Sequence, residues 1–247
     1  MQFIKYSSLE VVLGAVSYQY FIYYVYFGSF PPRVEGCLLA LSVWFIYLID
    51  RQIDNLFMPS QDERHYFHEE NKRLLRSIIG LLAFVILLLL PEAKAEVLFA
   101  GALLAAFVLV YGFAWHKGWL RVEKELVTAL LYGLGVGLVT WVKEPHSFLL
   151  VCALVALAYQ NLCFFTLLEN PSSFYKTRLR QTEWVVIGLI AGVFAANQDF
   201  FMVLPFLVTF GITFILSRIS STEKLRIWGD LAFWSPLIYL LHGIFSK

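Results

Sequence analysis

The sequence predicts an all-α membrane protein with about nine transmembrane helices around a central cavity that opens to the cytoplasmic side. Hydrophobic residues make up 60% of the 247 positions and charged residues only 15%, whereas about a quarter of an ordinary soluble domain is charged. Mean hydropathy is +0.70, and the apolar residues fall into blocks near the length that crosses a bilayer. These observations exclude an ordinary soluble fold and predict one transmembrane domain over residues 1–247.

Nine apolar blocks define the expected helices in order. They run approximately over Leu9–Phe27, Val34–Asp54, Leu74–Leu90, Val97–Trp115, Leu126–Val142, Phe148–Leu168, Trp184–Ala196, Phe200–Leu216 and Ile227–Phe245. The first block is weakly hydrophobic, and because no small-residue cleavage site stands out after it, we expect a retained span rather than a signal peptide. The seventh block is short, so eight spans remain the alternative.

The fifth block contains Gly133, Gly135 and Gly137. No strand precedes these glycines, which argues against a phosphate-binding loop. Small residues in membrane helices instead allow two backbones to approach closely. We therefore expect close helix packing at this point.

Positive charge sorts between the two sides of the expected bundle. Connections after the even-numbered helices, together with the N-terminal segment, carry 15 of the 19 Lys and Arg residues. The other side carries only Arg33, Lys94, Lys143 and Lys247. The positive-inside rule then predicts a cytoplasmic N-terminus and an outside C-terminus.

Two aspartates, Asp50 and Asp54, end the second apolar block. Residues four apart share one helix face, so the two carboxylates converge near the membrane surface. Charges at this depth are costly unless a partner or a function retains them, and two like charges raise the cost of ionising each other. A divalent cation relieves this cost, and oxygen ligands favour Mg²⁺ over softer metals.

Further polar residues fall near the same ends of other helices. They are Tyr111 and Lys117 at the end of the fourth block, Lys124 before the fifth, Asn161 and Glu169 in the sixth, and Arg226 and Asp230 in the ninth. For Arg226 with Asp230, the structural interpretation, an ion pair along one helix face, is favoured over a functional one.

The segment between the second and third blocks predicts a short interfacial helix. Ser60 and Glu63 form a capping-box pattern, in which each side chain caps the backbone of the other. The helix would present Arg64, His65 and His68 toward the same mouth, where they would help to hold phosphate. Zinc binding by the two histidines is the alternative.

Together these residues predict a site for a metal-chelated polyanion above an apolar interior. Mg²⁺ bridges carboxylate to phosphate oxygens, and Arg or Lys takes the remaining charge. Below the mouth the chain offers 23 Phe, 13 Tyr and 7 Trp residues. A substrate with a diphosphate head and a hydrocarbon tail fits both zones.

In these features the chain resembles the UbiA-like intramembrane prenyltransferases over nearly its whole length. The first acidic motif of that family reads roughly Asn-x-x-x-Asp-x-x-x-Asp, and Asp50 and Asp54 match its aspartates, with Ile46 at the asparagine position. The second motif is a pair of aspartates four apart. Its ladder here is Asn161, Phe165, Glu169 and Ser173. The pattern as a whole resembles a divergent bacterial branch of that family.

The resemblance implies Mg²⁺-dependent ionisation of a prenyl diphosphate and transfer of the allylic group to an aromatic or lipid acceptor, in the bacterial inner membrane. The implied catalytic residues are Asp50, Asp54, Asn161 and Glu169, of which Asp50, Asp54 and Glu169 would hold the metal. The implied diphosphate-binding residues are Arg64, His68, Tyr111, Lys117 and Lys124. Membrane lipids are expected partners and nucleic acid is not.

Two rival functions stay open. A terpene cyclase of the same fold would capture the cation with its own chain, without an acceptor. A non-catalytic lipid-binding homologue would have kept the fold and lost the second metal site, which Ile46 and Ser173 favour. For Asp50 and Asp54 themselves, the structural alternative is an ion pair with Arg51 or a water-exposed helix end.

Overall fold

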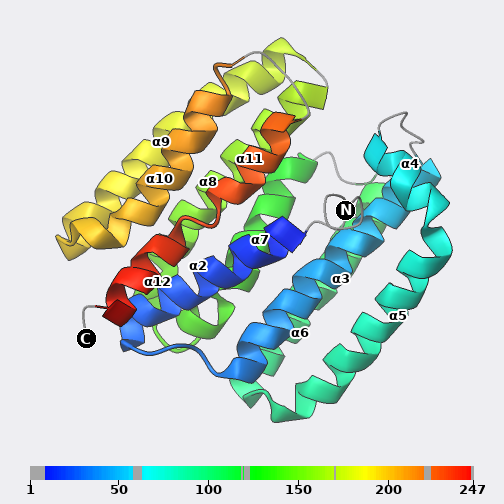
Figure 1. The fold of residues 1–247 in the computed structure, drawn as a ribbon, viewed down its shortest axis with the longest axis horizontal. Helices are drawn as coiled ribbons and strands as arrows, with labels where there is room; N and C mark the ends of the chain where they lie inside the picture. The colour runs from blue at the N-terminus through cyan, green and yellow to red at the C-terminus, as the bar shows by residue number, and fades with distance from the viewer. Residues whose placement is uncertain are drawn as a thin grey trace.

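The computed structural model describes residues 9–57, 63–117, 119, 123–169, 171–219 and 224–245, and in these residues every regular secondary-structure element is a helix (Figure 1). The prediction of an all-α fold is confirmed for this part of the chain. The helices are α2 (Leu9–Phe27), α3 (Arg33–Phe57), α4 (Glu63–Glu70), α5 (Lys72–Leu89), η1 (Leu90–Glu92), α6 (Ala95–His116), α7 (Lys124–Trp141), η2 (Pro145–Ser147), α8 (Phe148–Glu169), α9 (Ser173–Asn197), α10 (Phe200–Leu216), α11 (Lys224–Ala232) and α12 (Pro236–Phe245).

Five of the described helices are long and apolar enough to cross a membrane by length and composition. These spans are Arg33–Ile53, Lys72–Glu92, Ala95–Trp115, Pro145–Glu169 and Ser173–Asn197. The apolar α10 is shorter. The structure thus supports a membrane protein, while nine spans around a central cavity remain a prediction.

Helix α8 forms the centre of the bundle, packed between α7 and α9. Figure 1 shows α9 and α10 side by side along one edge, α5 along the opposite edge, and α2, α7 and α8 between them. The largest buried cluster combines side chains of α2, α7 and α8 with side chains of α9 and α10, and fully buried Phe21, Leu154 and Phe206 are among them. A rigid apolar centre therefore fixes the helix ends that carry polar residues.

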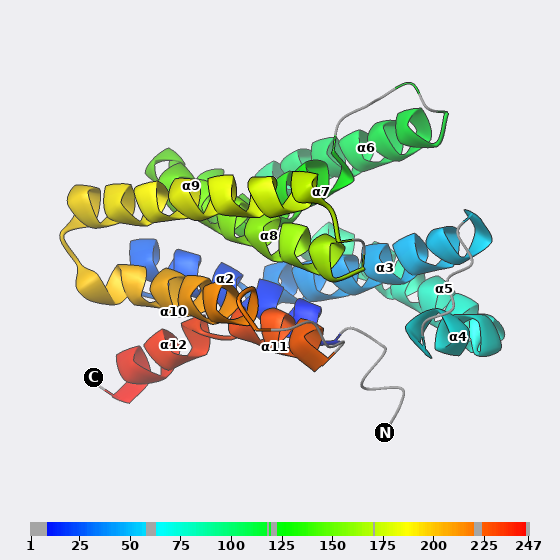
Figure 2. The ribbon, with the colours of Figure 1, turned by 90° about the horizontal axis from the view of Figure 1, so that it is seen from above.

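Helix α6 packs against α7 and leaves most of its apolar surface uncovered. Leu103, Phe107 and Val110 are all more than half exposed. Figure 2 shows α6 diverging from the α3–α5 pair. Such an apolar surface is stable in lipid rather than in water, because hydrocarbon tails are as apolar as leucine.

The glycines of α7 behave as the sequence predicts at two of three positions. A Cβ atom on Gly133 would lie 2.3 Å from Val155, and one on Gly137 would lie 2.4 Å from Val151, both on α8. Gly135 meets no atom within 4 Å. Close packing of α7 on α8 therefore depends on Gly133 and Gly137.

Two helices differ from the sequence-based expectation. Helix α9 begins at Ser173, not near Trp184, because the Ser172 hydroxyl accepts a bond from the Tyr175 N–H and caps a polar first turn. The ninth block is two helices, α11 and α12, separated by a turn before Pro236. Proline has no N–H and disfavours helical geometry in the preceding residue, which ends α11 early.

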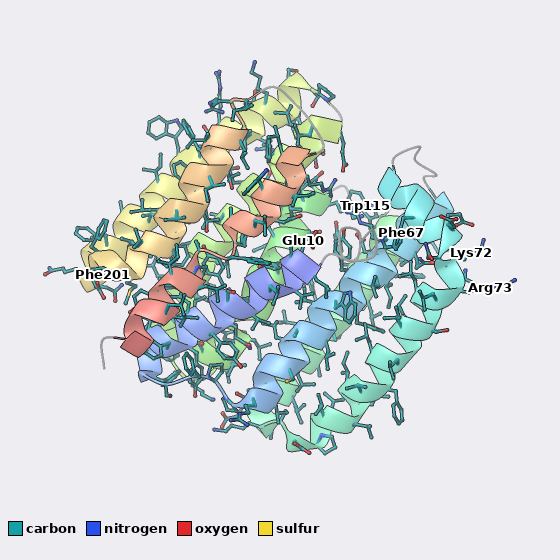
Figure 3. All side chains as sticks on the ribbon, in the orientation of Figure 1. Glu10, Phe67, Lys72, Arg73, Trp115 and Phe201 are labelled. Atoms are coloured by element: carbon teal, nitrogen blue, oxygen red, sulfur yellow. The ribbon has the colours of Figure 1, made fainter. Side chains whose placement is uncertain are left out.

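The short helix expected between the second and third blocks is present as α4. Beside it, the first turns of α5 carry exposed Lys72, Arg73 and Arg76. Figure 3 shows Lys72 and Arg73 projecting outward near α4. This end of the molecule is therefore the basic end, where lipid headgroups or a polyanion would be attracted.

A candidate site where α3, α8 and α11 meet

A pocket of about 170 Å³ lies where α3, α7, α8 and α11 come together. Its polar lining side chains are Tyr47, Asp50 and Arg51 of α3, Thr128 and Tyr132 of α7, Asn161 of α8, and Arg226 and Asp230 of α11. Its apolar lining consists of Val11, Ala158, Leu162, Phe165 and Phe233. Both charge signs therefore face one small space that has apolar walls.

Asp50 is placed on the pocket wall by the last turns of α3. Its carboxylate pairs with Lys124 at the start of α7, with Nζ and Oδ1 3.2 Å apart. Both side chains of this pair are about 40% exposed, so the pair marks the solvent side of the pocket. The neighbouring Arg51 donates from Nε to the Tyr47 hydroxyl at 3.1 Å and lies over the Tyr47 ring.

Asn161 is placed on the pocket wall by the central helix α8 and is only 5% exposed. Its Oδ1 atom has no hydrogen-bond partner among the described residues. A Cβ atom on Gly229 would lie 2.8 Å from this oxygen, so only glycine lets α11 approach so closely. A buried amide oxygen without a donor costs about 1–3 kcal/mol, which a ligand in the pocket could recover.

Helix α11 contributes Arg226 and Asp230, one turn apart on the same face. Asp230 is only 8% exposed. Arg226 reaches across to α8, where its guanidinium pairs with Glu169 and lies over the Phe165 ring. The sequence favours a structural ion pair between these two residues, and the structure places both on the pocket lining.

Glu169 ends α8 with a side chain that is 56% exposed. It is not among the residues that line the pocket. Its carboxylate instead pairs with the guanidinium of Arg226. The link from Glu169 to the pocket is therefore indirect, through Arg226.

Three other expected site residues lie away from the pocket lining. The hydroxyl of Tyr111 on α6 is buried without a hydrogen-bond partner in the described part of the chain, and its ring stacks on Phe107. Lys117 follows α6, is exposed and lies over the Phe113 ring. His68 on α4 is buried.

The side chains of Asp54, Arg64 and His65 lie outside the described part of the structure. Their backbones are helical, Asp54 in α3 and the other two in α4. Asp54 is one turn beyond Asp50, on the same helix face. Its part in a site, and those of Arg64 and His65, stay predictions.

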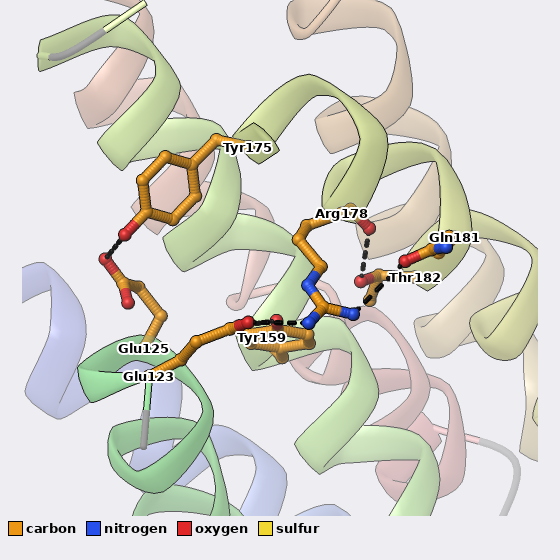
Figure 4. Close-up of polar contacts among 7 residues, drawn as sticks. All are labelled: Glu123, Glu125, Tyr159, Tyr175, Arg178, Gln181 and Thr182. Atoms are coloured by element: carbon orange, nitrogen blue, oxygen red, sulfur yellow. Dashed lines mark hydrogen bonds and ion pairs between the residues drawn. The ribbon is translucent and has the colours of Figure 1, made fainter. Parts of the chain in front are cut away.

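A second group of carboxylates, which the sequence does not single out, lies at the start of α7 (Figure 4). Glu123 accepts the hydroxyl of Tyr159 and pairs with Arg178 at 2.9 Å. Glu125 accepts the hydroxyl of Tyr175 at 3.0 Å and that of Thr166 at 2.9 Å. The feature of the sequence that could have indicated this group is the Glu-Lys-Glu run at the start of a helix, where acidic side chains interact favourably with the helix dipole.

This cluster joins the start of α7 to α8 and α9. Lys124 lies between the two glutamates in sequence and points to the other side, toward Asp50. Because its neighbours are held by several partners, the backbone that carries Lys124 is held in place. The cluster therefore positions a pocket-side cation.

The described residues contain no group of three or more His, Cys, Asp and Glu side chains close enough to hold a metal ion. The pocket does offer oxygen atoms from two carboxylates, Asp50 and Asp230, and the unpartnered amide oxygen of Asn161. Mg²⁺ usually takes one or two carboxylates and completes its shell with water and substrate phosphates. The residues present therefore fit Mg²⁺ that arrives with a phosphorylated ligand.

No protein-family model, no curated protein and no solved structure matches this chain. The resemblance to the UbiA-like family therefore rests on the acidic motifs and helix pattern alone and remains a proposal.

Proposed function

We propose that this chain is an intramembrane enzyme that transfers an isoprenoid group from a prenyl diphosphate to an acceptor, with Mg²⁺ as cofactor. The observation that carries the proposal is the composition of one pocket. Asp50, Asn161 and Asp230 meet Arg51 and Arg226 there, within walls of apolar helices. A pocket with both oxygen ligands and guanidinium groups suits an anion that carries its own cation.

The reaction requires the bond between the allylic carbon and the diphosphate oxygen to break, with the electron pair leaving on the diphosphate. Arg51, Arg226 and Lys124 would neutralise this growing charge, and such preorganised electrostatic stabilisation is commonly the largest catalytic term. Mg²⁺, held in the pocket with Asp50 among its ligands, would supply additional neutralisation when bound. The acceptor then forms the new carbon bond and loses a proton.

The apolar part of the lining protects the cation that forms. Leu162, Phe165 and Phe233 exclude water, which would otherwise convert the cation into an alcohol. The aromatic faces also attract positive charge. A pocket of about 170 Å³ is smaller than the ~300–1,000 Å³ typical of drug-sized ligands, so it would take the diphosphate head and leave the rest of the tail between helices or in lipid.

The test is release of inorganic diphosphate by purified protein in lipid nanodiscs. Geranyl, farnesyl and geranylgeranyl diphosphates are supplied with Mg²⁺ or with EDTA, with and without aromatic and lipid acceptors. We expect diphosphate release that depends on Mg²⁺ and is abolished in Asp50→Ala. Glu92→Ala is the control and should release diphosphate like the unmodified protein, because Glu92 is an exposed carboxylate in η1, after the C-terminal end of α5. Folded protein that releases no diphosphate under any of these conditions would contradict the proposal.

A non-catalytic lipid-binding function is the second candidate, and two ion pairs favour it. Lys124 already neutralises Asp50, and Arg226 already neutralises Glu169. A binding protein would take up prenyl diphosphate without releasing diphosphate. The organic extract of the same assay also separates prenyl transfer from a terpene cyclase, which yields a cyclic product without any acceptor.

A further inference from the structure

We infer that Asp230 of α11 supplies the second carboxylate of a divalent-cation site, together with Asp50 of α3 and Asn161 of α8. The inference rests on the proposed function in taking the cation to be the one that accompanies the diphosphate. It replaces Glu169, the second carboxylate that the resemblance implies, with a residue from a different helix.

Burial and direction of the side chains support this choice. Asp230 lines the pocket and is 8% exposed, so its side chain is largely removed from water, and a cation in the pocket would offset the cost of ionising it there. Asn161 lines the same pocket, is 5% exposed, and its Oδ1 finds no donor among the described residues. An unpartnered buried oxygen that lines the same pocket as two carboxylates is one that a cation can satisfy together with them.

The partner of Glu169 explains why that residue is not used. Its carboxylate is bound by Arg226 and lies outside the pocket lining. Arg226 also packs on Phe165, which helps to hold its guanidinium in place. A swing of Glu169 into the pocket would therefore break its ion pair with a positioned arginine. The same arrangement leaves Arg226 at the pocket, where it can face a phosphate.

Two features hold α11 where Asp230 needs it. Gly229, the residue before Asp230, allows α11 to lie directly on Asn161 and Phe165. The end of α11 is tied to α10, because the Thr209 hydroxyl donates to the Ala232 carbonyl at 3.0 Å. The carboxylate is therefore carried by a fixed helix and not by a loop.

The ion pair of Asp50 does not prevent the cation from binding. Lys124 contacts one carboxylate oxygen, Oδ1, at 3.2 Å, and both side chains are substantially exposed. Exposed pairs of this kind are weak and screened by salt. A divalent cation can therefore displace the ammonium or use the second oxygen.

The test measures metal binding directly, by electron paramagnetic resonance of Mn²⁺ added to the full chain in nanodiscs. Titrations run with and without inorganic pyrophosphate, so no turnover is needed. Asp230→Asn and Asp50→Asn should each weaken Mn²⁺ binding at least about tenfold. Glu169→Gln and the exposed control Glu92→Gln should leave it within about twofold of the unmodified protein.

A gain of affinity guards against variants that merely damage the fold. Asn161→Asp adds a third carboxylate, so Mn²⁺ should bind about tenfold more tightly, which a structural role for Asn161 would not produce. Mn²⁺ binding that Glu169→Gln weakens and Asp230→Asn does not would overturn the inference. So would unmodified protein that binds no Mn²⁺ even with pyrophosphate.

Failure of the inference and failure of the proposed function give different results. Diphosphate release together with Mn²⁺ binding that is unchanged in Asp230→Asn overturns the inference about Asp230 but still supports the proposed enzymatic function. Mn²⁺ binding that depends on Asp230 and Asn161, with no release from any prenyl diphosphate, supports the site and contradicts the enzyme.

Discussion

Replacing Thr209 by valine should loosen the end of α11 and measurably destabilise the protein. Thr209 is fully buried in α10. Its hydroxyl lies 2.7 Å from the Tyr18 hydroxyl, 2.7 Å from the Ser235 hydroxyl and 3.0 Å from the Ala232 carbonyl oxygen. It therefore joins α2 and α10 to the turn between α11 and α12.

The magnitude follows from how many of these bonds exist at once. A hydroxyl donates a single proton. Thr209 donates to the Ala232 carbonyl and Ser235 donates to the Pro205 carbonyl at 2.8 Å, so Thr209 makes two bonds, the second accepted from Tyr18. Loss of two hydrogen bonds at about 1 kcal/mol each, together with the cost of leaving their former partners unpaired, should lower the free energy of unfolding of Thr209→Val by about 2–3 kcal/mol. Hydrogen bonds between membrane helices average about 0.6 kcal/mol, which sets a floor of about 1 kcal/mol for two.

The assay is thermal unfolding in nanodiscs, with Thr213→Val as the matched control. Thr213 is also buried in α10, one turn further on, and its hydroxyl has no hydrogen-bond partner in the described structure. The melting temperature should fall by about 2–4 °C per kcal/mol in Thr209→Val and should be unchanged or raised in Thr213→Val. Equal losses in the two variants, or less than about 0.5 kcal/mol in Thr209→Val, would refute the reasoning.

Three further predictions use the same preparations. Gly133→Ala places a Cβ atom against α8 and should cost about 1–3 kcal/mol of stability, whereas Gly135→Ala, in open space, should be neutral or stabilising in the same melting assay. The nearly buried Glu183 carboxylate pairs with Arg218 at 2.9 Å, so Arg218→Met should lower the free energy of unfolding by about 3 kcal/mol. Adding Glu183→Leu should recover most of this loss, and no recovery would contradict a charge effect. Lys124→Gln removes the ammonium that competes for its carboxylate partner on α3, so Mn²⁺ should bind about two- to fivefold more tightly without pyrophosphate, and weaker binding would show that the lysine supports the site.

The parts of the site that the sequence predicts are those set by local spacing. Asp50 lies at the end of an apolar helix, and Asn161 lies two turns before the end of another, so the helical period alone orients both. The structure brings these two to one pocket. The glycines of α7 predict close packing, which Gly133 and Gly137 make; Gly135 meets no atom within 4 Å, so the sequence does not show which glycines make the contact.

The parts that could not be predicted depend on contacts between distant segments. Arg226 has Asp230 as its obvious local neighbour, but its guanidinium pairs with Glu169, 57 residues away in sequence. Glu123 and Glu125 likewise bind tyrosines on α8 and α9, and a single sequence does not show which helices are adjacent. Polarity was misleading as well, because the charged first turns of α9 are helical although they resemble a loop.

The exposure of the site residues distinguishes an outer side of the proposed site, in contact with water, from a buried inner side. Asp50 and its partner Lys124 are both about 40% exposed, whereas Asn161 and Asp230 are less than 10% exposed. A charged ligand that enters from water therefore meets the weakly held ion pair first and the desolvated oxygen ligands last. Electrostatic interactions strengthen as water is excluded, so the inner carboxylate contributes most at the point where the ligand is fully enclosed. On the proposed function this order is required, because a diphosphate must be bound before its bond to the isoprenoid breaks in a space that water cannot reach.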